Sequence, residues 1–294
     1  MPELPEVETV REGLERLLLG KTLASITVLH PRAVQRSEGG VEGLVALHGR
    51  TVEAVARRGK FLWMEMAGLA LNFHLGMSGQ LLVSSPGAVA PPHPHERARL
   101  RFSDGSHLRF IDQRTFGYIQ RSSLTEVPDG APAGWGTTST LIPVPVAHIG
   151  RDLLDPALDL EELSKRTRKK RTEIKRAMLD QELVSGLGNI YCDEALFRAR
   201  IHPRRKTNGL SYGSLGGLWE HSTAVLREAL AQGGTSFDSL YVDVDGASGY
   251  FERSLRAYGR GGQACVRCGA TMKKIQFMNR SSTFCPICQP LSRG

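Results

Sequence analysis

Four cysteines near the carboxyl end constrain what this chain can fold into more than any other feature. Cys265 and Cys268 form one CxxC pair, and Cys285 and Cys288 form a second after a spacer of sixteen residues. Four thiolates at this spacing can surround one zinc ion, a better interpretation than two disulfides or unrelated thiols. Because protein ligands would fill all four positions, we expect one structural Zn²⁺ that holds a hairpin. The remaining Cys192 lies in an apolar helical stretch and is interpreted as a core residue.

The composition is that of a folded protein with a basic surface. The chain has 294 residues, of which 40% are hydrophobic and 23% are charged, and its net charge is +8. This length predicts more than one domain, and the charge favours a polyanionic partner such as nucleic acid without proving one. The sequence contains no apolar run of membrane-spanning length and no basic leader before an apolar run. We therefore expect a cytoplasmic protein with no membrane partner.

The amino-terminal part of the chain reads as one helix followed by strands. Apolar residues recur every three or four positions from about 4 to 19, which predicts a helix. From about 22 to 122, β-rich runs alternate with glycine-containing turns, which predicts a sheet or sandwich. We expect a first domain over residues 1–135.

The remainder of the chain reads as helical, with a small unit at its end. A stretch rich in Pro and Gly at 127–145 is typical of a connection between domains. Helical periodicity follows over 160–176, 178–183, 188–200 and 210–232. We expect a helical domain over 150–257 and a metal-stapled finger over 258–294.

The first residues of the chain combine an unusual amine with carboxylates. If Met1 is removed, Pro2 presents a secondary amine, and an α-amino group with a pKa near roughly 8 is partly neutral at physiological pH. Glu3 is placed to exchange protons beside that amine, and Glu6 lies in the first helical turn. An ordinary acidic helix start is the alternative interpretation.

Seven motifs occur in order along the chain: MPELPEVETVR, HLGMSGQL, DQRTFG, GLGNIYCDEALF, IHP, YGR and the CxxC pair. Together, from Met1 to Gln289, they resemble formamidopyrimidine-DNA glycosylase, a bacterial family that repairs oxidised purines. The resemblance implies an α+β fold: an N-terminal helix plus β-sandwich, a helical domain with a helix-two-turn-helix motif, and a C-terminal zinc-finger hairpin.

The resemblance also implies catalytic roles. Pro2 matches the family's nucleophile, and Glu3 matches the acid that assists base loss and proton transfer. Glu6 matches a supporting carboxylate and is counted among the DNA-binding residues. Lys60 matches a lysine that contacts phosphate near the lesion, and Arg280 matches the zinc-finger arginine.

Further residues match the family's DNA contacts. His74 and Asn189 match phosphate contacts, whereas Met77, Arg114 and Phe116 match the set that fills the space left by an extruded base. Without the resemblance, Met77, Phe116 and His74 would be interpreted as core residues. The segment 233–251 corresponds to the family's mobile lesion-recognition loop.

The resemblance predicts a bifunctional DNA glycosylase and AP lyase of base excision repair. It would remove 8-oxoguanine and formamidopyrimidines through an iminium on Pro2 and cut the strand by β,δ-elimination. Its partner would be double-stranded DNA with an oxidised purine or abasic site, and it would act as a monomer in the bacterial cytoplasm, at the nucleoid. Two alternatives remain: an oxidised-pyrimidine glycosylase of the endonuclease VIII type, which the PELPE opening disfavours, and a non-catalytic zinc-finger DNA-binding protein.

Overall fold

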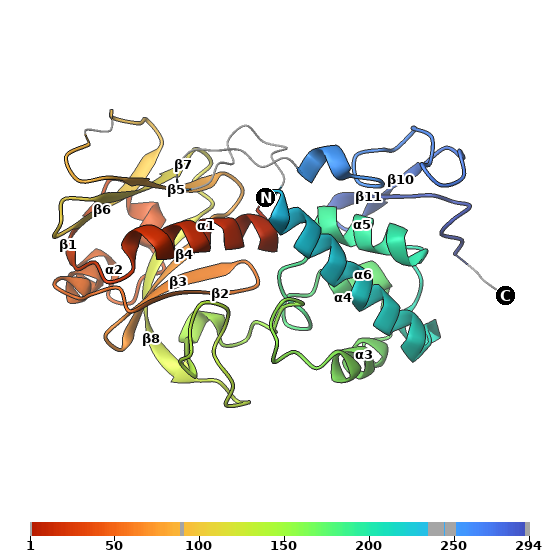
Figure 1. Cartoon of the computed structure of the whole chain (residues 1–294), viewed down its shortest axis with the longest axis horizontal. Helices are drawn as coiled ribbons and strands as arrows, with labels where there is room; N and C mark the ends of the chain where they lie inside the picture. Colours follow the sequence, from red (N-terminus) through yellow and green to blue (C-terminus); the bar gives the residue numbers. More distant parts are fainter. Residues whose placement is uncertain (1, 89–90, 235–243, 245–250, 292–294) are drawn as a thin grey trace. The chain divides into compact units, whose positions relative to one another are not determined.

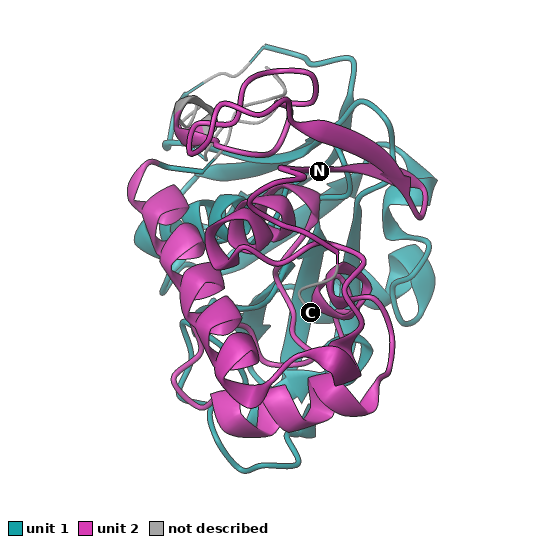
Figure 2. Ribbon diagram, turned by 90° about the vertical axis from the view of Figure 1, so that its right-hand side faces the viewer, with its two compact units in different colours: residues 1–148, 233–250 teal, residues 149–232, 251–294 magenta. Residues whose placement is uncertain are grey.

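The computed structural model describes residues 2–88, 91–234, 244 and 251–291. Packing divides the chain into two compact units, which Figure 2 colours separately. Unit 1 comprises Met1–His148 and Gly233–Tyr250, and unit 2 comprises Ile149–Gln232 and Phe251–Gly294. The division into domains at 1–135, 150–257 and 258–294 stays a prediction, because packing within a unit does not establish independent folding. Within the described residues, no helix has both the length and the apolar character needed to span a membrane.

Unit 1 contains two antiparallel sheets, as the alternating runs predicted (Figure 1). One sheet has the order β1-β6-β7-β5, and the other has the order β2-β3-β4-β8-β9. The strands are β1 (Leu23–Val28), β2 (Ala54–Arg58), β3 (Phe61–Met66), β4 (Leu69–His74), β5 (Gly79–Ser84), β6 (Glu96–Phe102), β7 (His107–Asp112), β8 (Tyr118–Glu126) and β9 (Leu141–Pro143). Short helical pieces connect them: α2 (Gly40–Gly43), η1 (Pro31–Val34), η2 (Leu44–Leu47) and η3 (Val144–Val146).

Helix α1 (Leu4–Leu18) shares its hydrophobic core with both sheets. Its apolar residues Val7, Val10 and Leu14 follow helical spacing and are buried, and the helix contacts β2, β3 and β5. The helix begins at a capping box, in which Glu6 Oε2 accepts a hydrogen bond of 2.8 Å from the backbone nitrogen of Glu3. The predicted helix from about 4 to 19 is confirmed.

A buried ion-pair network ties α1 to β2. Glu8 Oε1 lies 2.8 Å from Arg11 Nε, and Glu8 Oε2 lies 2.6 Å from Arg57 Nε. Arg57 also donates through Nη1 to the carbonyl oxygen of Gly59, the residue before Lys60. All three charged side chains are buried, so each depends on its partners for compensation of lost hydration. The network therefore connects the helix that follows Pro2 with the turn that carries Lys60.

Unit 2 is built from four helices and a hairpin. Its elements are α3 (Leu160–Lys169), α4 (Ile174–Met178), α5 (Asn189–Ala199), η4 (Thr207–Gly209), α6 (Tyr212–Ala231), η5 (Phe251–Ser254), β10 (Lys273–Phe277) and β11 (Arg280–Phe284). The strands β10 and β11 are antiparallel, with Phe277 paired to Arg280 next to the turn. The mixed helix and sheet class, and the C-terminal hairpin, are as predicted.

Two predicted helices of unit 2 are wrong in part. The helix predicted over 160–176 ends at Lys169, because Arg171 has a φ of +48° and the Ile174 nitrogen donates to the distant Arg205 carbonyl oxygen. Residues 179–183 form turns where a helix over 178–183 was predicted. There the side chains of Asp180 and Gln181 accept hydrogen bonds from the backbone of residues that follow them, which competes with helix formation.

The Glu8–Arg57 pair generates a stability prediction. Arg57→Met should lower the free energy of unfolding by about 3 kcal/mol, because it removes one partner of a buried carboxylate. Adding Glu8→Gln should restore part of that loss, and urea unfolding of the single and double variants measures the coupling. Lys165→Met, which breaks the exposed Lys165–Glu161 pair, is the control and should have no measurable effect. A double variant whose loss equals the sum of the losses of Arg57→Met and Glu8→Gln would contradict a coupled pair.

Candidate functional site

The start of α1 carries the predicted nucleophile and its carboxylates. Pro2, Glu3 and Glu6 are all buried in unit 1. Gly234 lies against Glu6, since a Cβ atom added to Gly234 would be 2.9 Å from Glu6 Oε1. Gly234 also has a φ of +81°, so two constraints favour glycine here. Most of the segment 233–251, interpreted from sequence as the lesion-recognition loop, lies outside the described residues.

His74 ends β4 within a group of stacked rings. Its ring is nearly parallel to that of Tyr118, with 5.1 Å between centroids, and tilted against Phe61 at 5.4 Å. The guanidinium carbon of Arg36 lies 4.4 Å from the centre of the Tyr118 ring. The interpretation of His74 as an isolated core histidine is therefore incomplete, because the ring belongs to a partly buried stack with a cation at its edge.

The same surroundings fix the protonation of His74. Burial lowers the pKa of His74 from 6.5 to about 4, and the positive charges of Arg36 and Lys60 act in the same direction. Nδ1 accepts a hydrogen bond of 3.2 Å from the backbone nitrogen of Gly76. A neutral imidazole that accepts at Nδ1 carries its proton on Nε2. His74 is thus arranged as an uncharged hydrogen-bond donor beside Lys60, which is half-buried in the turn between β2 and β3.

Asp112 holds together the two loops that carry the predicted space-filling residues. Its carboxylate is fully buried, and Oδ1 accepts from Ser78 Oγ at 2.6 Å and from the Arg114 nitrogen at 3.2 Å. Oδ2 accepts from the Gly117 nitrogen at 2.7 Å. A Cβ atom on Gly76 would lie only 2.6 Å from that same nitrogen, so the loops touch through their backbones. The loop after β4 and the loop after β7 are thereby fixed to each other.

The three predicted space-filling residues project from these loops. Arg114 Nη1 lies 3.8 Å from the Met77 sulfur, and Phe116 follows two residues later. Met77 is 40% exposed and Phe116 is 55% exposed. Exposure on this scale excludes the interpretation of either side chain as a core residue, and large exposed apolar side chains on one rigid support are typical of a binding surface.

In unit 2, Asn189 is the first residue of α5, at the end of the turns that follow α4. Gln181 fixes these turns: Nε2 donates to the carbonyl oxygens of Leu179 and Leu187, both at 3.0 Å, and Oε1 accepts from the Gly186 nitrogen at 3.0 Å. The Asn189 Oδ1 atom is buried and has no hydrogen-bond partner among the described residues. This oxygen can only accept a hydrogen bond, whereas the Nδ2 of the same amide can donate one to an anionic ligand at the helix start.

The four cysteines converge at the base of the β10–β11 hairpin. The Sγ atoms of Cys265, Cys268, Cys285 and Cys288 all lie within 4.8 Å of one another. Ligands about 2.3 Å from a tetrahedral zinc are separated by about 3.8 Å, so the cluster fits one Zn²⁺. Backbone nitrogens also donate to sulfur, as at Cys288 nitrogen and Cys285 Sγ with 3.3 Å between them, which favours thiolates. The predicted structural zinc site is confirmed by this cluster.

Arg280 is exposed at the other end of the hairpin, at the first position of β11. Lys273 and Lys274 are exposed on β10, and Asn279 lies in the turn. The hairpin therefore presents basic and polar side chains while zinc fixes its base.

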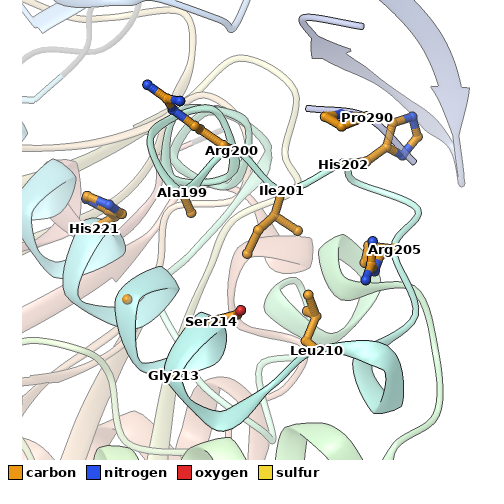
Figure 3. Close-up of a pocket in the computed structure, with 11 residues that line it drawn as sticks. Ala199, Arg200, Ile201, His202, Arg205, Leu210, Gly213, Ser214, His221 and Pro290 are labelled. Atoms are coloured by element: carbon orange, nitrogen blue, oxygen red, sulfur yellow. The ribbon is translucent and has the colours of Figure 1, made fainter. Parts of the chain in front are cut away.

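A pocket of about 210 Å³ in unit 2 holds none of the predicted site residues. Figure 3 shows it between the end of α5, at Ala199 and Arg200, and the first half of α6, at Ser214 and His221. Asn189 lies at the opposite end of α5, about 16 Å away along an eleven-residue helix. The pocket therefore lies at the end of α5 away from Asn189.

Sequence reasoning missed the residues that support the site. Asp112 could have been found, since an Asp that precedes a turn containing Gly commonly binds the backbone of that turn. Arg36 and Tyr118 carried no signal, because their contact with each other and with His74 joins three distant segments. In unit 1 the structure brings Met77 close to Arg114 and His74 close to Lys60, while Pro2, Glu3 and Glu6 lie at the start of α1. Asn189, Arg280 and the cysteines belong to unit 2.

Comparison with known proteins identifies these features. The protein combines a zinc-binding hairpin, two helices joined by turns, and a sheet domain that begins with a helix rich in carboxylates. These features together define a class of zinc-finger DNA glycosylases. Residues 1–119 match the formamidopyrimidine-DNA glycosylase N-terminal domain, residues 149–240 match its H2TH domain, and residues 262–291 match the zinc finger found in FPG and IleRS. The chain belongs to the formamidopyrimidine-DNA glycosylase family.

Relatives and solved structures agree along the whole chain. The formamidopyrimidine-DNA glycosylase of Mycobacteroides abscessus is 52% identical, over 99% of both chains, and that of Mycobacterium avium is 51% identical, over 100% of both. A complex of Lactococcus lactis Fpg with DNA containing an abasic site is similar with a TM-score of 0.80 and 33% identity, over 98% of this chain and 99% of that one. A MutM complex with DNA containing carbocyclic 8-oxo-G has a TM-score of 0.81 and 33% identity, over 98% and 100%.

The pKa of His74 generates a prediction about acid stability. Because its pKa is about 4 in the folded protein and 6.5 when unfolded, the unfolded chain binds more protons between these values. The free energy of unfolding should therefore fall as pH is lowered from 6.5 to 4, by on the order of 2 kcal/mol from this residue. Urea unfolding at several pH values should show a smaller decline for His74→Gln. Parallel pH profiles for the two proteins would contradict a buried neutral imidazole.

The cysteine cluster generates a prediction about metal removal. Cys285→Ser, or chelation of zinc, should weaken DNA binding and disorder the β10–β11 hairpin, while α3 to α6 stay largely folded, because the hairpin is too small to be stable alone. Zinc content, helical circular dichroism and fluorescence anisotropy with labelled duplex measure the three effects. Cys192→Ser is the matched control, because that buried thiol is outside the cluster. Full affinity in metal-free protein would overturn the expectation.

Proposed function

We propose that this chain is a bifunctional DNA glycosylase and AP lyase that removes 8-oxoguanine and formamidopyrimidines during base excision repair. The observation that carries the proposal is the start of α1, where Pro2 is buried beside the carboxylates of Glu3 and Glu6. Membership of the family supports the same activity. A protein that only bound DNA would have no need for Pro2 and two carboxylates buried together at this position.

The proposed chemistry begins at the Pro2 nitrogen once Met1 is removed. Its lone pair forms a bond to sugar C1′ while the N-glycosidic bond breaks. The base leaves with the bonding electrons and takes up a proton to balance the one that the Pro2 nitrogen loses. Glu3 delivers the proton that opens the sugar ring at O4′, which yields an iminium. Loss of a C2′ proton then expels the 3′ phosphate, and a second elimination expels the 5′ phosphate. Water finally hydrolyses the iminium, which releases the sugar fragment and frees the Pro2 amine. Glu6 holds the backbone of Glu3 in place through its capping hydrogen bond.

Four residues are proposed to hold DNA phosphates. Lys60 supplies a point charge, and neutral His74 supplies an Nε2–H donor next to it. Asn189 offers a side-chain amide at a helix start, and Arg280 offers a guanidinium on the zinc-fixed hairpin. Zinc, when bound to the four cysteines, would keep that hairpin folded.

Met77, Arg114 and Phe116 are proposed to replace the extruded nucleotide. Extrusion of a base costs a few kcal/mol, which apolar and polar contacts in the vacated space must offset. Phe116 is suited to wedge between bases, and Arg114 to hydrogen-bond the orphaned partner base. The Asp112 contacts keep both loops rigid, so these side chains are held in place before DNA arrives.

The partner proposed for this chain is duplex DNA with an oxidised purine or abasic site, bound by a monomer at the bacterial nucleoid. Similar solved proteins support this choice: a Lactococcus lactis Fpg variant was solved with DNA containing Fapy-dG, and MutM with DNA containing carbocyclic 8-oxo-G. Four phosphate-holding residues and a base-replacing set on one chain need no second copy.

Borohydride trapping tests the proposed nucleophile. Borohydride should reduce the iminium to a stable protein–DNA adduct, and mass spectrometry should place the DNA on Pro2. A variant that retains Met1 has its prolyl nitrogen in an amide and should lose both base excision and trapping, by a factor of about 100 or more. Pro2→Gly keeps a terminal amine and should retain some adduct.

Lys60→Ala is the matched control, because Lys60 offers the competing amine. It should keep trapping while it weakens lesion binding. An adduct that persists with Met1 retained and disappears in Lys60→Ala would assign the chemistry to Lys60.

A further inference from the structure

A buried ion pair in unit 2 has no part in the chemistry above. Lys175 on α4 and Asp193 on α5 are 0% and 1% exposed, and Lys175 Nζ lies 2.6 Å from Asp193 Oδ1. Burial of two charges is unfavourable unless further hydrogen bonds compensate, and its usual benefit is a defined geometry. The Lys175–Asp193 pair is therefore expected to fix the position of the groups that are bound to it.

The pair is bonded to the strand that begins at Arg280. Ser282 Oγ donates to Asp193 Oδ1 at 2.7 Å, and the Thr283 nitrogen donates to Asp193 Oδ2 at 2.9 Å. Lys175 Nζ also donates to the Ser281 carbonyl oxygen at 3.4 Å. Both Asp193 oxygens are thus occupied, and three consecutive residues of β11 are bound to α4 and α5.

Two proposed phosphate contacts lie directly next to this ion pair. Asn189 precedes Asp193 by four residues on α5, so their side chains lie on the same side of the helix, one turn apart. Arg280 directly precedes Ser281 on β11. The distance between Asn189 and Arg280 therefore depends on how Asp193 holds the strand.

The zinc site does not duplicate this function. The cysteines fix the base of the hairpin, whereas Asp193 bonds to β11 nearer the turn, at Ser282 and Thr283. Charged hydrogen bonds are directional, so they fix the position of the strand along α5 better than apolar packing would. Phe277, whose ring centre is 5.6 Å from Lys175 Nζ, shields the pair from the β10 side.

We propose that Asp193, held by Lys175, is a positioning residue that sets the separation of Asn189 and Arg280, and hence their simultaneous grip on DNA phosphates. This inference rests on the proposed roles of those two residues in phosphate binding. It does not depend on the Pro2 chemistry.

A double-mutant cycle tests the inference. Asp193→Asn, Arg280→Ala and the double variant are compared by fluorescence anisotropy with a duplex that contains a tetrahydrofuran abasic analogue, at several salt concentrations. Asp193→Asn should weaken binding roughly tenfold, the order expected for one charge-assisted contact, and should reduce the salt slope by about one phosphate. In the Arg280→Ala background it should have little further effect, because the contact it positions is already gone.

Two controls separate positioning from charge and from folding. Glu228→Gln removes the same charge from a partly exposed pair with Arg198 on unit 2 and should leave binding unchanged. Ser282→Ala removes one hydrogen bond and keeps the Lys175–Asp193 pair, so it provides a milder variant if Asp193→Asn does not fold. Its smaller loss of affinity should also vanish in the Arg280→Ala background, and zinc content should be unchanged in every variant.

Single-turnover measurements separate the positioning role from catalysis. At saturating DNA, Asp193→Asn should excise base at the rate of the parent protein, with only KM raised. Three outcomes would each overturn the inference. They are additive losses of affinity in the cycle, an Arg280→Ala variant that binds DNA as tightly as the parent protein, and a reduced excision rate of Asp193→Asn at saturating DNA. If the proposed glycosylase activity fails instead, the parent protein excises no base, while the binding cycle still gives its result.

Discussion

The carboxylate of Asp112, fully buried, accepts hydrogen bonds from the loop after β4 and from the loop after β7. Loops do not by themselves hold a side chain at a fixed place, and the proposed space-filling residues lie on these two. Glu8 acts in the same way between α1 and the turn before Lys60, through Arg57. Asp193 does so between α5 and β11. The proposed DNA contacts thus depend on buried carboxylates that bind turns and strand ends.

This arrangement also places part of the negative charge of the protein in its interior. The chain carries 38 Lys and Arg against 30 Asp and Glu, yet several acids are buried and satisfied by internal donors. Glu194, next to Asp193, accepts hydrogen bonds from the backbone nitrogens of Arg256, Ala257 and Tyr258 at the start of the finger. Acids that are bound to internal donors are thereby kept away from the surface that DNA would meet.

The sequence predicted the features whose cause is local. The cysteine spacing predicted the zinc site, and helical spacing predicted α1, because the residues responsible are close in the chain. The break between α3 and α4 was missed because residues 205–207 bond the backbone around Thr172, a contact that no local pattern encodes. The Asp193 contacts with Ser282 and Thr283 join residues some ninety positions apart, which only the folded chain brings together. Site roles came from the family resemblance, and the supporting network came from the structure.

The surroundings of His74 and Lys60 show how such a supporting network would affect the recognition of a DNA phosphate. A third positive charge next to Arg36 and Lys60 would repel both, and burial raises its energy further, so the fold keeps His74 neutral. The Gly76 nitrogen occupies Nδ1 and leaves the proton on Nε2. In the proposed site, Lys60 would supply attraction that acts over distance and is screened by salt, whereas His74 would supply a short directional hydrogen bond. A phosphate placed between them would be drawn by one residue and oriented by the other, although neither is unusual in isolation.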